Sequence, residues 1–479
     1  MTRLTSQVIS ESAAFWVTIA FVVMVFALGG GSRADIEFLK VLRPASVLFL
    51  IYGLWGLRSD QVAPFRVLFG FAAVLLIFVA VELIPLPPSI WRALPGREVA
   101  AQIDHMAGLG DVWRPVSLVP VSTWNALFAL IVPVTMLVLL ARLRRQQLYH
   151  VLLVILVFGV LSGLIGLLQV IGPSDGPLYF YQITNFGSSV GLFANRNHQA
   201  ALLACMFPML AAYASYGVTE PEDVRRRGWT ALLVGILIVP LLLMTGSRAG
   251  LVLGLIGLIA VPLVYKRPVL KAVRKRKQTL GYMPYVLGGA TVVGLGLLTF
   301  LLARASVFSR IFAQDPTDDL RWQIWGPIFR LSGKYFPFGS GVGSFVEVFE
   351  MDEPRHILDT TYVNHAHNDF LEVLMTGGAP AVLLFVAAVV FWVMATRRAL
   401  FSRDARPTDT VFARLGSVLV FMLAVASVSD YPLRVPSMAC LFVLAAVWLA
   451  PFSLRLPSKS NTELRQIGDG SIATPSLRN

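Results

Sequence analysis

The chain has 479 residues, of which 56% are hydrophobic and only 14% are charged. Soluble domains carry about 25% charged residues, so a chain this poor in charge cannot cover a water-facing surface, and a soluble enzyme is excluded. Intrinsic disorder is excluded too, because 11% of the residues are aromatic. The net charge is +13, but the positive residues gather in loops between apolar runs, where they signal membrane topology. Nucleic-acid binding is therefore not expected.

About twelve apolar runs are long enough to cross a bilayer. In chain order they cover residues 13–30, 44–57, 65–84, 123–141, 150–171, 198–217, 229–246, 249–265, 283–303, 368–396, 411–429 and 435–452. The second run is short and is flanked by Arg43 and Arg58, so it is the least secure. The first run is too long for the hydrophobic part of a cleavable signal peptide. The sequence thus predicts an all-α polytopic membrane protein.

The dense basic clusters predict the orientation of the chain. With the N-terminus inside and the spans alternating, every large cluster falls in an inner loop, which is the positive-inside pattern. These clusters are Arg142–Arg145, Arg225–Arg227, Lys266–Lys277 and Arg397–Arg406. We therefore expect both termini in the cytoplasm, with residues 453–479 as a polar cytoplasmic tail. The clusters themselves serve topology and contact with anionic membrane lipids.

Three loops then lie on the outer side, at residues 85–122, 172–197 and 304–367. The last of these is too long to be a simple connection. It is rich in aromatic residues, among them Trp322, Trp325 and Tyr335, and we expect two or three short helices at the membrane rim. Its glycine-rich segment Gly339–Phe345 follows no clear strand and opens no obvious helix, so it is not a dinucleotide fingerprint. A close backbone approach explains such glycines better.

Five polar clusters lie at the outer ends of the predicted spans, where each polar group is costly unless it has a function or a partner. They are Phe193–His198, Thr245–Gly250, Asp318–Trp322, Asn364–Asp369 and Ser429–Arg434.

Arg248 occupies a tight turn between two apolar helices. Its guanidinium must point either into the mouth of the bundle or up to the lipid headgroups. In the first case it forms an anion site, because a planar guanidinium grips phosphate through two hydrogen bonds. Arg321 offers the same chemistry or pairs with Asp318 or Asp319, and Arg196 similarly could pair with an acidic loop residue.

His365 and His367, with Asp369 nearby, look at first like metal ligands. Two histidines spaced i, i+2 point the same way only on an extended segment, and no third close ligand is obvious. Cys205 and Cys440 each lie inside an apolar run, so they supply neither a zinc site nor a disulfide framework. We therefore expect no metal. Asn368 and Asp369 suit the N-cap of the following helix, which puts His367 just outside a helix N-terminus that favours anions.

These clusters, in this order along a multispan chain, resemble the O-antigen ligase and polymerase superfamily of bacterial inner membranes. The matching segments are Gly191–Asn197, Thr245–Arg248, the surroundings of Arg321, Gly339–Phe345 and His367–Glu372. The resemblance covers roughly residues 150–450, and the N-terminal third matches in hydropathy alone. The family more usually has proline where Arg196 stands.

The resemblance implies an inverting, metal-independent glycosyltransferase of the GT-C-like type that needs no cofactor. It takes a glycan from undecaprenyl diphosphate at the periplasmic face. By position, Arg248 and Arg321 would bind the diphosphate and His367 would be the catalytic histidine, with His365 as the competing candidate. Supporting residues would be Arg196, Asn197, Asn368, Asp430 and Arg434.

The implied organisation is an N-terminal membrane region at 1–150, an O-antigen ligase-related domain at 151–452 with the periplasmic loop 304–367, and the tail. The acceptor is either another lipid-linked glycan, as in an O-antigen or exopolysaccharide polymerase, or lipid A-core, as in a lipopolysaccharide ligase. We favour polymerase, because nothing in the sequence marks a lipid A-core acceptor. Other polysaccharide-assembly proteins are further expected partners. A lipid-linked glycan flippase or transporter is the alternative of another class, but it should carry charges near the membrane midplane.

Overall fold

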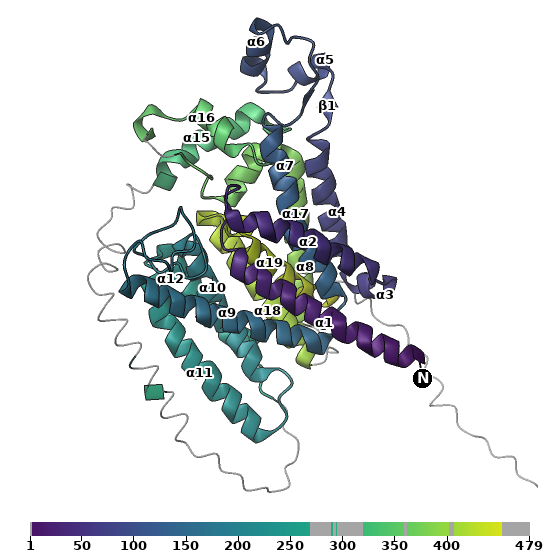
Figure 1. Cartoon of the computed structure of the whole chain (residues 1–479), viewed down its shortest axis with the longest axis vertical. Helices are drawn as coiled ribbons and strands as arrows, with labels where there is room; N and C mark the ends of the chain where they lie inside the picture. Colours follow the sequence, from purple (N-terminus) through teal and green to yellow (C-terminus); the bar gives the residue numbers. More distant parts are fainter. Residues whose placement is uncertain are drawn as a thin grey trace, which may run out of the picture.

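The computed structural model describes residues 2–268, 289–290, 294, 320–358, 362–401 and 407–452. In these ranges the chain is a bundle of long helices with a smaller cap at one end (Figure 1). The strands described are a single short antiparallel pair in the cap, β1 (Pro85–Leu86) and β2 (Arg114–Pro115). An all-α membrane-type architecture is thus confirmed.

The helices of the bundle follow the predicted spans. They are α1 (Thr2–Leu28), α2 (Glu37–Trp55), α3 (Ser59–Val62), η1 (Ala63–Phe65), α4 (Arg66–Val81), α7 (Pro120–Ala129), α8 (Ile131–Ala141), α9 (Arg145–Ile171), α10 (Arg196–Ser215), α11 (Pro221–Met244), α12 (Arg248–Val264), α17 (Asp369–Phe401), α18 (Pro407–Ser429), α19 (Pro436–Leu449) and η5 (Ala450–Phe452). The remaining helices are α5 (Pro88–Arg92), α6 (Glu98–Met106), α15 (Leu320–Tyr335), α16 (Phe345–Met351), η3 (Arg355–Ile357) and η4 (Pro432–Arg434).

Seven helices in the described ranges are long and apolar enough to cross a membrane. Three shorter apolar helices, Ser12–Leu28, Arg248–Val264 and Pro436–Leu449, match further predicted spans, and α10 matches the sixth. The ninth predicted span, 283–303, lies almost wholly outside the described residues, so the full number of spans stays a prediction. Residues 304–319 and the tail 453–479 also lie outside them.

One boundary was predicted wrongly. Arg43 was expected to flank the second span, but α2 begins at Glu37 and contains Arg43. The guanidinium does not point out to water, because its Nη1 donates to Asn125 Oδ1 at 2.7 Å. A polar partner inside the bundle therefore allows the helix to continue through the arginine.

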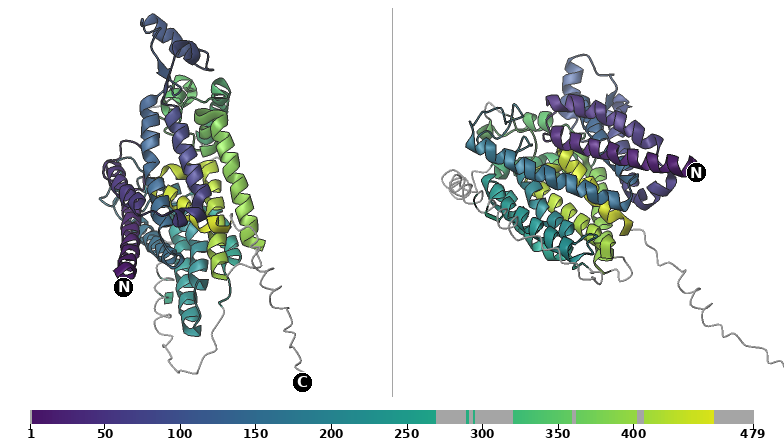
Figure 2. Two further views of the ribbon diagram at one scale, coloured as in Figure 1. Left: turned by 90° about the vertical axis from the view of Figure 1, so that its right-hand side faces the viewer. Right: turned by 60° about the horizontal axis from the view of Figure 1, so that its bottom comes forward.

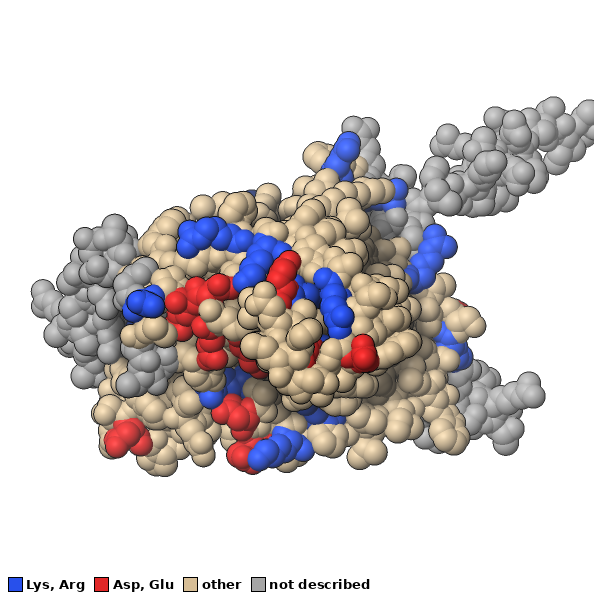
Figure 3. All heavy atoms as spheres, turned by 90° about the horizontal axis from the view of Figure 1, so that it is seen from above, with Lys and Arg blue, Asp and Glu red and all other residues tan. Residues whose placement is uncertain are grey.

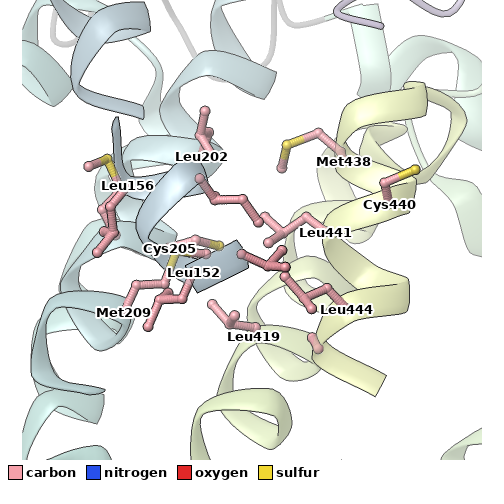
Figure 4. Close-up of a cluster of buried hydrophobic side chains, with 14 of the residues drawn as sticks. Leu152, Leu156, Leu202, Cys205, Met209, Leu419, Met438, Cys440, Leu441 and Leu444 are labelled. Carbon is pink, nitrogen blue, oxygen red and sulfur yellow. The ribbon is translucent and has the colours of Figure 1, made fainter. Parts of the chain in front are cut away.

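The core of the bundle surrounds α10, most of whose side chains are buried. Figure 4 shows part of this core, where Cys205 lies near Leu152 and Met209, and Cys440 lies on α19. Both cysteines are free and buried, as predicted. Helices α10 and α12 pack closely, since a Cβ built at Gly250 would meet Ala200 Cβ at 2.4 Å. Small residues permit this approach, which places the first turns of α10 and α12 side by side.

We call the end of the bundle that carries α5, α6, α15 and α16 the capped end. The expected short helices of the large loop are present as α15, α16 and the turn η3. The glycine-rich segment joins this cap to the bundle: Gly339 has φ +80°, and a Cβ there would meet Thr376 O at 2.3 Å. The predicted close backbone approach is confirmed. The expectation that no helix follows was wrong, because α16 begins at Phe345.

The opposite end, which we call the basic end, gathers the described basic clusters. Arg145 at the start of α9 pairs with Asp409 near the start of α18. Arg227, near the start of α11, donates to Tyr216 O at 2.9 Å, just after α10. Most of Lys266–Lys277, together with Arg403 and Arg406, lies outside the described residues. The described clusters thus share one end, which is what the positive-inside pattern requires.

We expect the basic end to face the cytoplasm, and cysteine labelling can check this. Met106 on α6 is 79% exposed at the capped end, and the side chain of Arg226 is 60% exposed at the basic end. A membrane-impermeant maleimide added to intact spheroplasts should label Met106→Cys and not Arg226→Cys. The native cysteines are buried and should give little background. Permeabilised spheroplasts should label both variants, and the reverse pattern in intact ones would invert the topology.

Candidate active site

A buried carboxylate, Asp430, lies between the end of α18 and η4 at the capped end, where it is only 3% exposed. Its Oδ2 accepts a hydrogen bond from Asn197 Nδ2 at 2.7 Å, and a longer one from Asn195 Nδ2 at 3.4 Å. Its Oδ1 accepts from the backbone N–H of Tyr431 at 2.9 Å. Asp430 therefore holds the start of α10 against the end of α18.

Two histidines face the same carboxylate. His198 Nε2 and His367 Nδ1 each lie 3.7 Å from Asp430 Oδ1. Burial on its own would raise the pKa of Asp430. The two neighbouring imidazoles outweigh it and hold this pKa well below its usual range. Asp430 is thus a permanent negative charge at the centre of the cluster.

The same network reaches the turn that carries Arg248. Asn197 Oδ1 accepts from Ser247 Oγ at 2.7 Å, and Ser247 Oγ accepts from Gly250 N at 3.0 Å, which caps α12. Arg248 is the first residue of that helix. Asp430 therefore fixes the backbone position of Arg248 through Asn197 and Ser247.

The segment 364–369 carries the two candidate histidines. Asn368 caps α17, since its Oδ1 accepts from Phe370 N and Leu371 N, as predicted. His367 adopts a left-handed backbone conformation, with φ +47°. This turn in the backbone separates the two rings: His365 Nδ1 lies 3.2 Å from Glu372 Oε1, whereas His367 Nδ1 faces Asp430. Burial is the main reason that the pKa of His365 is lowered.

Tyr431 was not singled out from the sequence, yet its ring lies among the histidines. The ring centroids of His365, His367 and His198 are 4.3, 5.1 and 5.3 Å from that of Tyr431. Its hydroxyl accepts from Asn364 Nδ2 at 3.2 Å, and burial raises the pKa of the phenol. The only hint in the sequence was its place in the polar cluster Ser429–Arg434.

The remaining predicted residues lie around this centre. Arg434 bridges Asp369 Oδ1 at 3.2 Å and Glu372 Oε1 at 3.0 Å. Arg321 lies at the start of α15, and one turn later Trp325 Nε1 donates to Ala366 O at 3.1 Å, which ties that helix to the histidine segment. Arg196 opens α10, and its backbone N–H donates to Asn185 Oδ1. Asp318 and Asp319, the expected partners of Arg321, lie outside the described residues.

A cavity of about 550 Å³, lined by both polar and apolar side chains, opens on one side of the histidine segment. Residues with charged or ionisable side chains line it, among them Arg33, Arg43, His365, Glu372 and Arg434. Figure 3 shows basic and acidic side chains intermixed over the capped end. Arg248, Arg321 and His367 do not line this cavity. Sequence reasoning missed Arg33 and Arg43.

The side chains offer little for a metal ion. In the described ranges no group of three or more His, Cys, Asp or Glu residues is arranged to hold one. The left-handed turn at His367 is the reason that His365 and His367 do not converge. The cluster instead places His365 against Glu372, and His198 and His367 against Asp430.

Residues 233–386 match a family model described as O-antigen ligase. The matched stretch contains Arg248, Arg321, His365 and His367. This match supports a relationship to the O-antigen ligase-related superfamily, and with it a bacterial membrane enzyme of the ligase or polymerase type acting on a lipid-linked glycan and an acceptor. A search of curated proteins found no match to the chain.

The stability of the cluster should depend on Asp430. Replacing Asp430 with alanine leaves two asparagine amides and a backbone N–H without their acceptor, and it removes the charge that two imidazoles face. Breaking such a buried charged network costs about 3 kcal/mol or more. Thermal unfolding in detergent should therefore show a clearly lower transition for Asp430→Ala. Asp60→Ala, which removes an exposed carboxylate paired with Arg58, should not change the transition, and equal effects would contradict the proposed role of Asp430.

Proposed function

We propose that this chain is a glycosyltransferase at the periplasmic face of the inner membrane, which moves a glycan from undecaprenyl diphosphate to a sugar hydroxyl as a polysaccharide or O-antigen polymerase. One observation carries the proposal: Arg248, Arg321 and His367 lie on segments that are joined at the capped end through Asp430 and Ala366. Transfer from an anionic donor to a hydroxyl needs cations for the diphosphate and a base for the hydroxyl proton at one place.

Arg248 and Arg321 are proposed to bind the diphosphate. Arg248 begins α12, so its guanidinium and the positive end of the helix dipole act in the same region. Arg321 begins the described part of α15, which Trp325 anchors to the histidine segment. A departing diphosphate gains negative charge, and fixed guanidiniums stabilise it without reorganisation. This positive charge is what a divalent cation would otherwise supply, so we propose a reaction without a metal ion.

His367 is proposed as the general base. The acceptor hydroxyl oxygen attacks the anomeric carbon of the donor sugar, the new C–O bond forms with inversion, and the bond to phosphate breaks. The electron pair of that bond leaves with the lipid diphosphate, and the hydroxyl proton passes to His367. Since Nδ1 of His367 faces Asp430 at 3.7 Å, Nε2 is the nitrogen available to the acceptor. Asp430 orients the ring and stabilises its protonated form.

A ligase that joins the glycan to lipid A-core is the second candidate, favoured by the description of the matching family. The two candidates share donor, base and leaving group, and they differ only in the acceptor. A flippase is disfavoured, because in the described part of the chain the predicted site residues gather at the capped end.

The diphosphate assignment predicts that Arg248→Ala and Arg321→Ala each lower transfer by about 10²–10³, the typical effect of one preorganised donor. Arg→Lys should restore little activity, because an ammonium cannot form the two parallel hydrogen bonds of a guanidinium. Purified protein with a synthetic lipid-diphosphate donor gives the rates. Arg330→Ala, an exposed arginine on α15, is the matched control and should stay active. Normal transfer by both alanine variants would refute the assignment.

The base assignment predicts that His367→Ala and His367→Asn both lose about 10²–10⁴ in rate while donor binding survives. Asparagine tolerates a left-handed backbone, so His367→Asn keeps the turn and removes only the basic nitrogen. The same substitution at His365 should cost less. Single-turnover rates with pre-bound donor separate chemistry from binding. If His367→Asn transfers at a near-normal rate while His365→Asn does not, the base is His365.

A further inference from the structure

The cavity beside His365 is lined in part by Arg43, which has no counter-ion among the residues that the structure describes. Arg43 lies inside the apolar helix α2, and its only described hydrogen bond is to the neutral amide of Asn125. It forms no ion pair with any described residue. An arginine inside a membrane helix is costly, so an anionic group that meets Arg43 would stabilise it.

An apolar groove of about 460 Å³ lies below this cavity. Helices α4 and α17, which run side by side in Figures 1 and 2, form two of its walls, and α8 and α19 form its floor. Its lining is aliphatic and aromatic, with Phe71 from α4, Leu137 from α8 and Ala388 from α17 as examples. These belong to helices apolar enough to lie in a membrane.

The cavity and the groove are continuous. Leu75, Pro133, Val342, Leu433 and Arg434 line both. Arg434 therefore stands where the polar space meets the apolar one. The molecule that fits has a lipid chain, an anionic group at the junction and a polar part above it.

The walls also restrict the kind of lipid. The groove has a volume of about 460 Å³, which suits one lipid chain, whereas lipid A carries several acyl chains side by side. The polar part of the cavity presents carboxylates, an amide and a phenol, such as Glu347, Asn364 and Tyr362. Such mixed donors and acceptors suit sugar hydroxyls. A saccharide on a single isoprenoid diphosphate satisfies all three parts.

We propose that the cavity and the groove form the acceptor site, which holds a second lipid-linked saccharide. Its prenyl chain lies in the groove, its diphosphate meets Arg43, and its sugars contact Asn364 and His365. The donor binds on the other side of the histidine segment, at Arg248 and Arg321, and the acceptor hydroxyl reaches His367 across that segment. This inference rests on the proposed function and specifies it as polymerisation.

Binding stoichiometry tests the proposal. The probe is a synthetic tetraprenyl diphosphate that carries one N-acetylglucosamine, added to the purified full chain in detergent and followed by native mass spectrometry. Wild-type protein should bind two equivalents. Ala388→Trp fills the groove and should bind one, and Arg43→Ala should weaken one site by about tenfold or more. An Arg248→Ala, Arg321→Ala double variant should lose the other equivalent.

Matched controls guard against misfolding. Ala387→Trp puts the same ring one residue away, on an exposed position outside the groove lining, and should bind two equivalents. Lys40→Ala removes an exposed cation of α2 that pairs with Glu37, and should behave as wild type.

The outcomes separate the two proposals. Two equivalents retained by both Ala388→Trp and Arg43→Ala, or one equivalent on wild type, overturn the acceptor site. One prenyl diphosphate with one lipid A-core molecule bound beside it overturns the isoprenoid occupant and points to a ligase. If Ala388→Trp loses one equivalent but the double arginine variant loses none, the acceptor site stands and the donor assignment fails.

Discussion

The carboxylate of Asp430 is the interaction on which the rest of the site depends. A buried charge is tolerated only if hydrogen bonds and opposite charges surround it, and here these come from the start of α10, from Tyr431 and from His198 and His367. Each of these segments is thereby held where the carboxylate needs it. Through Asn197 and Ser247 the same requirement extends to the cap of α12. The position of Arg248 is thus a consequence of satisfying one buried carboxylate, and needs no bound substrate.

The packing of the bundle makes that arrangement rigid. Close contact between α10 and α12 at Gly250 brings their first turns together, and the indole of Trp325 fixes α15 to the backbone of Ala366. Groups that stabilise developing charge act best when they are oriented before the substrate arrives. The helix ends and the histidine segment meet this condition with contacts that are all internal to the protein. The proposed chemistry therefore depends on where the helices that carry the arginines begin.

The sequence predicted the elements of this structure better than their junctions. Most of the described membrane helices, the N-cap at Asn368 and the buried cysteines depend on local pattern, and these were predicted correctly. Asp430 as a centre could not be predicted, because its partners Asn197 and His367 lie far away in the chain and meet only after the bundle packs. The boundary at Arg43 was predicted wrongly for a related reason. An arginine was expected to end the apolar span, but Asn125 of a different helix accepts its hydrogen bond. That partner is not visible in the local sequence. Tyr431 carries no local signal beyond its polar neighbours.

The left-handed turn at His367 explains why two histidines with metal-like spacing serve separate purposes. On an extended segment, residues at i and i+2 point to the same side, and the rings of His365 and His367 would converge. With φ +47° at His367, His365 meets Glu372 on one side of the segment, while His367 meets Asp430 on the other. Each imidazole then has its own carboxylate, and the Tyr431 ring lies against both. In the proposed polymerase reaction, this arrangement lets one lipid-linked substrate bind on each side of the segment, with His367 facing the donor side.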